Sequence, residues 1–189
     1  MNLDLQYRLA RPEDSAIIAK LMVQAIGDMA NHLVSKEKAF DAKAVFKYFI
    51  QQKENLYSYE NTIICEENNK VVGSINGYDG AKFMQLRQPF INYLKEHYDF
   101  NQMIEPETGA GEFYLDTVSV LPDKQSLGIG SVLIQKMIQY ASEKGHQKIG
   151  LLVDKKNPKA KKLYENLGFR KLDEIYLLGN KYDHLVFEL

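Results

Sequence analysis

The sequence is poor in several residue types and patterns that would indicate particular classes of protein. It has no tryptophan and one cysteine, Cys65, among 189 residues. No disulfide can therefore form within the chain, which suits a reducing compartment. The 24 basic and 25 acidic residues leave a net charge of −1, which gives no general attraction to nucleic acids or to anionic membranes. No apolar run is long enough to cross a bilayer.

Targeting signals and metal-binding patterns are also missing. Residues 1–6 lack the basic start and apolar core of a secretory signal, so we expect a cytoplasmic protein. His32 has no partner at metal-ligand spacing, and no metal site is expected. The length and the absence of repeats suggest a single domain, residues 1–189.

One stretch near the middle of the chain combines a strand, a glycine loop and a helix. A β-rich run, Phe113–Val120, is followed by Pro122, which lacks a backbone donor and ends the strand. Apolar residues recur at helical spacing from Ile129 onward. The loop between them contains Gly128 and Gly130, whose missing side chains let a ligand approach the backbone. Because the first N–H groups of a helix favour an anion, this stretch predicts a phosphate cradle.

Two familiar phosphate loops fit this stretch incompletely. A nucleotide-triphosphate loop needs a lysine after its last glycine, but Ser131 follows Gly130. A nicotinamide-dinucleotide site would use Gly128, Gly130 and, as ribose partner, Asp154. Leu133 stands where that fingerprint has its third glycine. A dinucleotide-binding domain remains an alternative.

A different family matches this loop and a second segment downstream. The spacing Gln125-x-x-Gly128-x-Gly130 resembles the pyrophosphate-binding signature of the GNAT acetyltransferase superfamily. The segment Asn157–Phe169 resembles the later motif of that superfamily, in which an asparagine opens a helix and Gly-Phe closes it. The order and separation of the two motifs also match.

The resemblance implies an N-acetyltransferase that moves an acetyl group directly from acetyl-coenzyme A to a primary amine. The pyrophosphate would be held by Gln125, Ser126, Leu127, Gly128, Ile129, Gly130 and Ser131. Backbone groups of Val118, Ser119 and Val120 would pair with the pantetheine arm. Asn157 would bond the pantetheine or support the site, and just before Pro158 it could equally be a helix N-cap. A protein that binds acetyl-coenzyme A without catalysis is the alternative within this family.

Acetyl transfer needs an acid for the leaving thiolate and a route for the proton of the amine. By the resemblance, Tyr164 occupies the position of the general acid, although it also lies on an apolar stripe with Ala160 and Leu167. Glu112 and Asp116 lie four residues apart and share one face of an unbulged strand. Either of them, or neither, could serve as the base.

Charge is unevenly distributed along the chain. Residues 96–123 contain seven acidic side chains and no lysine or arginine, whereas residues 136–171 contain ten basic ones. A basic flank would attract the phosphates of coenzyme A, and an acidic flank would attract a cationic amine. We therefore expect a cationic acceptor.

The hydrophobic periodicity and turn residues predict a mixed α/β order of elements. The expected strands are Leu5–Leu9, Thr62–Glu66, Val71–Gly77, Phe113–Val120, Lys148–Val153, Lys171–Leu178 and Lys181–Leu189, with a hairpin turn at Gly179-Asn180. The expected helices cover Ser15–Ile26, a segment capped by Asp41, a segment with Pro89 in its first turn, a segment from Ile129 to Lys144, and Ala160–Leu167. The resemblance adds a mixed, mostly antiparallel sheet whose two central strands splay apart, with helices flanking it.

Overall fold

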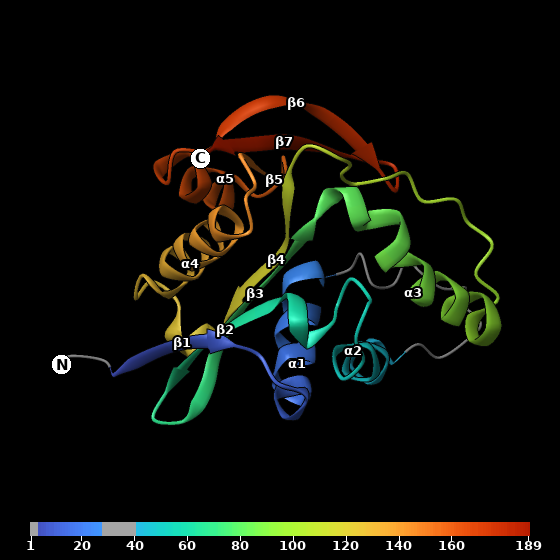
Figure 1. Cartoon of the computed structure of the whole chain (residues 1–189), viewed down its shortest axis with the longest axis horizontal. Coiled ribbons are helices and arrows are strands. Elements are labelled where there is room, and N and C mark those ends of the chain that lie inside the picture. Colours follow the sequence, from blue (N-terminus) through green and yellow to red (C-terminus); the bar gives the residue numbers. More distant parts are fainter. Residues whose placement is uncertain (1–3, 28–40) are drawn as a thin grey trace.

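The computed structural model describes residues 4–27 and 41–189, so His32 lies outside the described residues. Seven strands form one sheet in the order β1-β2-β3-β4-β5-β7-β6, with helices on both faces (Figure 1). The strands are β1 (Leu5–Leu9), β2 (Thr62–Glu67), β3 (Lys70–Asp79), β4 (Phe113–Val120), β5 (Lys148–Asp154), β6 (Arg170–Leu177) and β7 (Asn180–Glu188). The helices are α1 (Ser15–Ile26), α2 (Ala42–Ile50), α3 (Phe83–Tyr98), α4 (Ile129–Glu143) and α5 (Pro158–Asn166). The predicted fold class is confirmed.

The sheet is antiparallel except where its central strands β4 and β5 meet. This parallel pairing joins only Phe113–Leu115 with Ile149–Leu151. Beyond it, β4 stays paired with β3 as far as Val120, and β5 stays paired with β7 as far as Asp154. The two central strands therefore diverge toward their C-terminal ends, as predicted.

The β3–β4 pairing contains a bulge at the point of divergence. Asn76 faces Thr117 and Gly77 faces Leu115, so Asp116 has no partner on β3. A bulge bends its strand and turns side chains to new directions. The regular strand that we assumed for Glu112 and Asp116 is therefore wrong at Asp116 itself.

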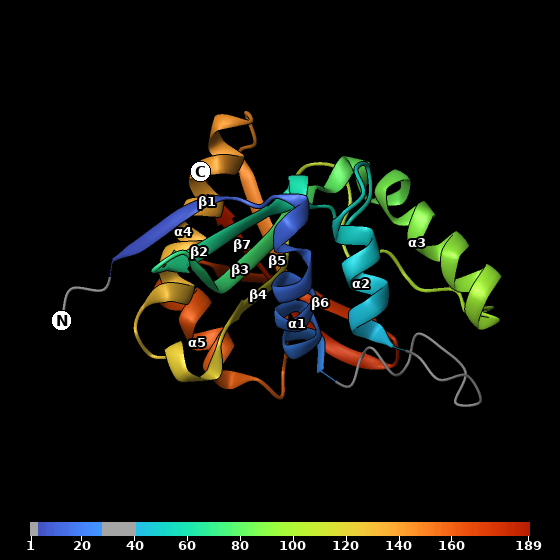
Figure 2. The same cartoon turned by 90° about the horizontal axis from the view of Figure 1, so that it is seen from below.

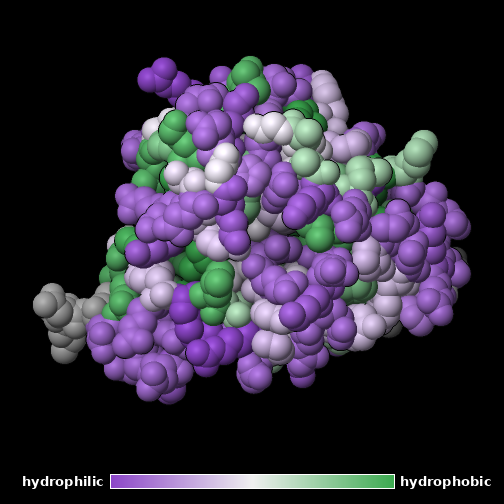
Figure 3. Space-filling view, in the orientation of Figure 1, coloured by the Kyte–Doolittle hydropathy of each residue, from purple (hydrophilic) through white to green (hydrophobic). Residues whose placement is uncertain are grey.

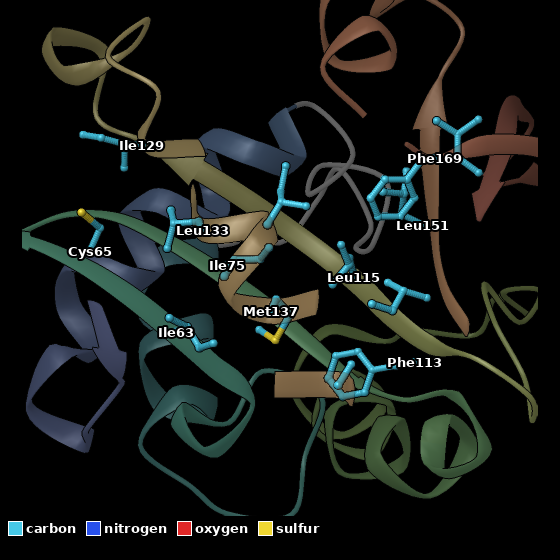
Figure 4. Packing of buried hydrophobic residues seen from close by; sticks show 14 of the residues in the cluster. Ile63, Cys65, Ile75, Phe113, Leu115, Ile129, Leu133, Met137, Leu151 and Phe169 are labelled. Atoms are coloured by element: carbon cyan, nitrogen blue, oxygen red, sulfur yellow. The ribbon is translucent and has the colours of Figure 1, made fainter. Parts of the chain in front are cut away.

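Two hydrophobic cores lie on opposite faces of the sheet. One is formed under α4, which contacts β2, β3 and β4; Figure 4 shows its side chains, including the fully buried Cys65. The other lies between the sheet and helices α1, α2 and α3, which Figure 2 shows grouped away from α4 and α5. Neighbouring residues of β2 supply both cores, Ile63 and Cys65 to the first and Ile64 to the second, because strand side chains alternate between faces.

Two expected boundaries are wrong. Helix α3 begins at Phe83, six residues before Pro89, so the proline lies inside the helix and removes one backbone donor from it. The last hairpin turns at Leu178 and Gly179, with φ of 48° and 77°, and Asn180 already pairs with Leu177. A two-residue hairpin turn of this hand needs positive φ at both positions, which leucine rarely adopts.

The surface is predominantly hydrophilic on the face seen in Figure 1. Figure 3 shows hydrophobic groups there only as small, separate areas among the described residues. Within residues 4–27 and 41–189, no helix combines the length and apolar character needed to cross a bilayer.

Candidate functional site

A cleft of about 970 Å³ opens where β4 and β5 diverge. One side of it is formed by Asp116–Val120 of β4 and the other by Leu152–Asp154 of β5. The N-terminal turn of α4 and one side of α5 line the cleft, as do residues of α1, α2 and α3. The splay of the sheet therefore creates the site.

The predicted phosphate cradle lies at the α4 end of the cleft. Gly128 precedes the helix with φ of 80°, and no side chain caps the helix. The first helical residues, through Ser131, line the cleft, and their N–H groups have no partner within the helix. A Cβ at Gly130 would meet only Val120 Cγ2, at 3.9 Å, so the glycine keeps space open in the cleft rather than serving the core. This cradle suits a pyrophosphate.

Six of the seven residues predicted for the cradle line the cleft. The exception is Leu127, a residue that is 49% exposed and lies outside the cleft lining. Ser126 adopts a left-handed backbone conformation, φ 64°, just before it. The turn of the loop therefore leaves only the backbone of Leu127 available to contribute to the cradle.

Strand β4 has a free edge in the cleft. Residues Val118–Val120 pair with β3 on one side, and the pairing with β5 ends before it reaches them. The carbonyl of Val120 accepts hydrogen bonds from Gln24 Nε2 at 2.9 Å and from Gln125 Nε2 at 3.1 Å. Gln24, on α1, also reaches Ser119 Oγ at 2.9 Å. Sequence reasoning did not single out Gln24, because nothing local marks a helix residue that bonds to a strand 95 positions away.

Tyr164 lies on α5 and lines the cleft. Its ring packs against Phe169, with ring centroids 5.9 Å apart. Tyr164 therefore contributes to packing, as its place on the apolar stripe of the helix indicated. No described residue offers its hydroxyl a hydrogen bond, and burial raises the pKa of Tyr164 to about 12. The phenol therefore keeps its proton at neutral pH.

Asn157 lines the cleft and caps α5. Its Oδ1 accepts a hydrogen bond from the N–H of Ala160 at 3.1 Å, as an N-cap does. The amide nitrogen of the same side chain has no partner among the described residues. A cap and a contact in the cleft are therefore compatible.

Two carboxyls lie in the cleft at the end away from the cradle. Asp116 lines it and accepts a hydrogen bond from the Tyr78 hydroxyl at 3.0 Å; burial raises its pKa. Glu107, which the sequence did not single out except as part of an acidic run, also lines the cleft and accepts from Tyr114 at 3.1 Å. Burial, and next the charge of Asp116, raise the pKa of Glu107.

Glu112 lies outside the cleft lining, in a buried network. Its Oε2 is 3.0 Å from His184 Nε2, and its Oε1 accepts from Thr108 at 2.7 Å. Burial would raise the pKa of Glu112, but the hydrogen bonds from His184 and Thr108 outweigh it and lower that pKa. A Cβ at Gly150 would lie 2.1 Å from Glu112 Oε2, so glycine is needed there. The two carboxylates predicted as candidate bases thus have different surroundings.

Some residues of each charged run line the cleft, and others do not. Of the acidic run, Glu107 and Asp116 line the cleft, and of the basic run, Lys156 and Lys159 do. Other lysines are engaged elsewhere: Lys155, Lys161 and Lys171 form ion pairs with Glu174 or Asp183. Within the described part of the chain, no group of His, Cys, Asp and Glu residues could hold a metal ion.

Comparison with known proteins extends this picture. Residues 27–169 match the model of the acetyltransferase (GNAT) family. A mycothiol acetyltransferase from Arthrobacter sp. (strain FB24) is 32% identical over 108 residues, covering 55% of this chain and 32% of the relative. A ribosomal protein bS18-alanine N-acetyltransferase from Haemophilus influenzae is 30% identical over 101 residues, covering 53% and 64%. The chain thus spans less than two thirds of the length of each of these relatives.

Solved structures match over nearly the whole chain. The crystal structure of an acetyltransferase superimposes with a TM-score of 0.79 at 29% identity, covering 97% of this chain and 98% of that one. The structure of an N-acetyltransferase from Staphylococcus aureus Mu50 gives 0.76 at 24% identity, covering 96% and 100%. With the family model spanning more than half of the sequence, and the same splayed sheet beneath it, the chain belongs to the acetyltransferase (GNAT) family.

Proposed function

We propose that the protein is an N-acetyltransferase that moves the acetyl group of acetyl-coenzyme A directly to a primary amine. The observation that carries this proposal is that one cleft joins four features: the glycine cradle, the free edge of β4, the Tyr164 hydroxyl and a carboxyl end. Phosphates suit the first of these and an ammonium group suits the last. The likeness to known acetyltransferases supports the same reading.

The residues in the cleft fit acetyl-coenzyme A. The loop from Gln125 to Ser131 would hold the pyrophosphate, with Lys156 and Lys159 nearby as cations. The free edge of Val118–Val120 would pair with the amides of the pantetheine arm, and the free amide nitrogen of Asn157 would donate to it. When bound, the thioester supplies the acetyl group and a thiolate leaving group.

The side chains that handle protons lie along the cleft. The Tyr164 hydroxyl retains its proton at neutral pH because burial raises its pKa to about 12, so it can protonate or hydrogen-bond to the departing sulfur. Backbone N–H groups on the free edge of β4 would donate to the developing oxyanion. Asp116 is the better candidate base of the two predicted, because it lines the cleft whereas Glu112 bonds to His184 outside it.

We expect the acceptor to be cationic and the enzyme to act in the cytoplasm. The support for a cationic acceptor is that Glu107 and Asp116 both line the end of the cleft away from the cradle. Long-range attraction of a cation to such an end would weaken as salt is added.

The test is a screen of primary amines with acetyl-coenzyme A, read by thiol release and by the mass of the acetylated product. We expect release that depends on the amine. Two outcomes would overturn the proposal. Thermal stabilisation by acetyl-coenzyme A without acetylation of any amine would favour a non-catalytic binding protein. Stabilisation by NAD and not by acetyl-coenzyme A would favour the dinucleotide reading based on Gly128, Gly130 and Asp154.

A further inference from the structure

Two tyrosines on neighbouring strands hold the two carboxyls in the cleft. Tyr78 of β3 and Tyr114 of β4 face each other in the sheet register, with ring centroids 5.7 Å apart. The hydroxyl of Tyr78 donates to Asp116 and that of Tyr114 to Glu107. Each carboxyl is thus fixed through one oxygen, and its other oxygen has no hydrogen-bond partner among the described residues.

No cation of the described residues forms an ion pair with either carboxyl. Arg87, on α3, lines the same end of the cleft, but within the described part of the chain it forms no ion pair with either carboxyl. Its Nη1 donates to the carbonyl of Ile104 at 3.1 Å, and its guanidinium lies over the Phe83 ring at 4.8 Å. Once the ammonium group has displaced the proton of the pair, two carboxylates and one arginine give this end a net charge of −1, which matches one ammonium group.

The wall beside the carboxyls is aromatic and uncharged. The cleft is lined there by Phe46 of α2, by Tyr57 of the segment between α2 and β2, and by Phe90 of α3. The rings of Phe46 and Tyr57 are 4.8 Å apart and those of Tyr57 and Phe90 are 4.9 Å apart, both edge to face. Such a wall favours an apolar body by burial, and its three described rings offer no negative charge to a second ammonium group.

Resting on the proposed function, we propose that Glu107 and Asp116 act as a pair that binds the ammonium group of the acceptor and takes its proton, and that the acceptor is a primary monoamine whose apolar body packs against the wall formed by Phe46, Tyr57 and Phe90. Glu107 thereby becomes a catalytic residue on the segment before β4, and the bulge at Asp116 brings the second carboxyl into the same end of the cleft.

The three protons of the ammonium group go to different places. One proton of the ammonium group passes to the carboxyl pair, and the neutral nitrogen attacks the thioester carbonyl. A C–N bond forms and the C–S bond breaks. The sulfur takes a proton from Tyr164, whose hydroxyl is then restored by a second proton of the nitrogen. The third proton stays on the amide. The carboxyl pair keeps the first until the next ammonium group displaces it to solvent, so each turnover yields an N-substituted acetamide, a thiol and one H⁺.

A pair performs this task better than a single carboxylate, because two carboxyls at one site do not both ionise easily. The raised pKa of each carboxyl agrees with this. The charged and titratable side chains around the pair are Arg87, Tyr57, Tyr78, Tyr114 and Tyr182. The tyrosines stay neutral because burial raises their pKa values. An arriving ammonium group therefore displaces a proton that the empty pair holds.

The experiment compares Glu107→Gln and Asp116→Asn with Glu105→Gln, an exposed carboxyl outside the cleft. The probes are 2-phenylethylamine, its neutral counterpart 2-phenylethanol, and the polyamine spermidine. Calorimetry in the presence of free coenzyme A, in buffers with different ionisation enthalpies, counts protons released on binding. Wild type and Glu105→Gln should bind 2-phenylethylamine with proton release, and both cleft variants should bind it at least tenfold more weakly and release fewer protons.

Kinetics provides a second readout. The acidic limb of kcat/KM for 2-phenylethylamine should move to lower pH in Asp116→Asn, since Glu107 loses the charge that raises its pKa. Spermidine should be a poorer substrate than 2-phenylethylamine. Unfolding midpoints close to wild type would exclude misfolding of the near-isosteric variants.

Failure of this inference is distinguishable from failure of the proposed function. If no amine gives thiol release, the proposed function is overturned, and the carboxyl pair is then judged by calorimetry alone. The pair is overturned if both cleft variants match Glu105→Gln in affinity and proton release, or if 2-phenylethanol binds as well as the amine. Preference for spermidine would overturn the monoamine assignment.

Discussion

The side-chain oxygen of Asn157 accepts a hydrogen bond from the N–H of Ala160 at 3.1 Å, and the same residue lines the cleft. One residue therefore starts α5 and borders the site. Its two ends are chemically different, the oxygen accepting and the nitrogen donating, so substitutions can separate its two roles.

Asn157→Asp and Asn157→Ser both retain a capping oxygen but lose the amide donor. We expect both to fold with near-normal stability and to bind acetyl-coenzyme A more weakly. Asn157→Ala should in addition lose about 1 kcal/mol of stability, because the cap is gone. Denaturant unfolding and cofactor titration measure the two effects. Asn157→Ser adds no charge, so comparing it with Asn157→Asp separates the loss of the donor from the effect of a new negative charge. Normal cofactor affinity in both variants would assign Asn157 to the cap alone.

Acetyl-coenzyme A should stabilise the protein by about 2.7 kcal/mol at a hundredfold excess over its dissociation constant. Gly130→Glu should abolish this effect, because its side chain enters the open space beside Val120 and its charge repels phosphate. Gln135→Glu, exposed on the same helix, is the matched control. Equal stabilisation of both variants, measured by thermal shift, would remove the glycine loop from the cofactor site.

Tyr164→Phe keeps the ring contact with Phe169 and removes only the hydroxyl. If the hydroxyl is a general acid, turnover should fall by about 10²- to 10⁴-fold, with little change in cofactor affinity. Wild-type turnover should show no basic limb from Tyr164 below about pH 12, where its pKa lies. Unchanged turnover in Tyr164→Phe, with chemistry limiting the rate, would remove the hydroxyl from the mechanism.

His184→Gln should destabilise the protein in a way that depends on pH. The hydrogen bond with Glu112 raises the pKa of His184, so the stabilisation by the imidazolium is complete below its unfolded pKa of about 6.5 and is lost as pH rises through the folded pKa. The lowered pKa of Glu112 adds stability above its unfolded pKa of about 4.3, which is lost as pH falls through its folded pKa.

The loss of stability in His184→Gln should therefore be largest between about pH 4.3 and 6.5. Denaturant unfolding at pH 5.5 and at pH 8.5 gives the comparison. His97→Gln, an exposed histidine on α3, is the control. A loss of equal size at both pH values would show that the network contributes packing and not charge.

Sequence patterns that are local in the chain were sufficient for most elements, including the strand and the helix on either side of the predicted cradle. Helix α1 begins and ends at the predicted residues, and the predicted strand Phe113–Val120 is β4. Asp41 caps α2 by accepting a hydrogen bond from the N–H of Ala44. Each of these rests on periodicity, caps or breakers within a few residues.

The remainder of the site depends on residues far apart in the chain. Gln24 meets Ser119 across 95 positions, and Glu112 meets His184 across 72. The bulge that isolates Asp116 is a property of the β3–β4 register, and no residue type near Asp116 signals it. Nothing local in the sequence singles out Tyr78 or Tyr114, and the β3–β4 register brings both beside the cleft carboxyls.

The short pairing between Phe113–Leu115 and Ile149–Leu151 has a consequence for dynamics. Among the described residues, these three registers are the only backbone ladder between the β1–β4 half of the sheet and the β5, β7 and β6 half. Separation of the two halves would break this short ladder and leave the antiparallel ladders within each half paired. A ligand that spans the cleft ties the halves together, and amide hydrogen exchange should then slow throughout β5, β6 and β7, including strands that never touch the ligand.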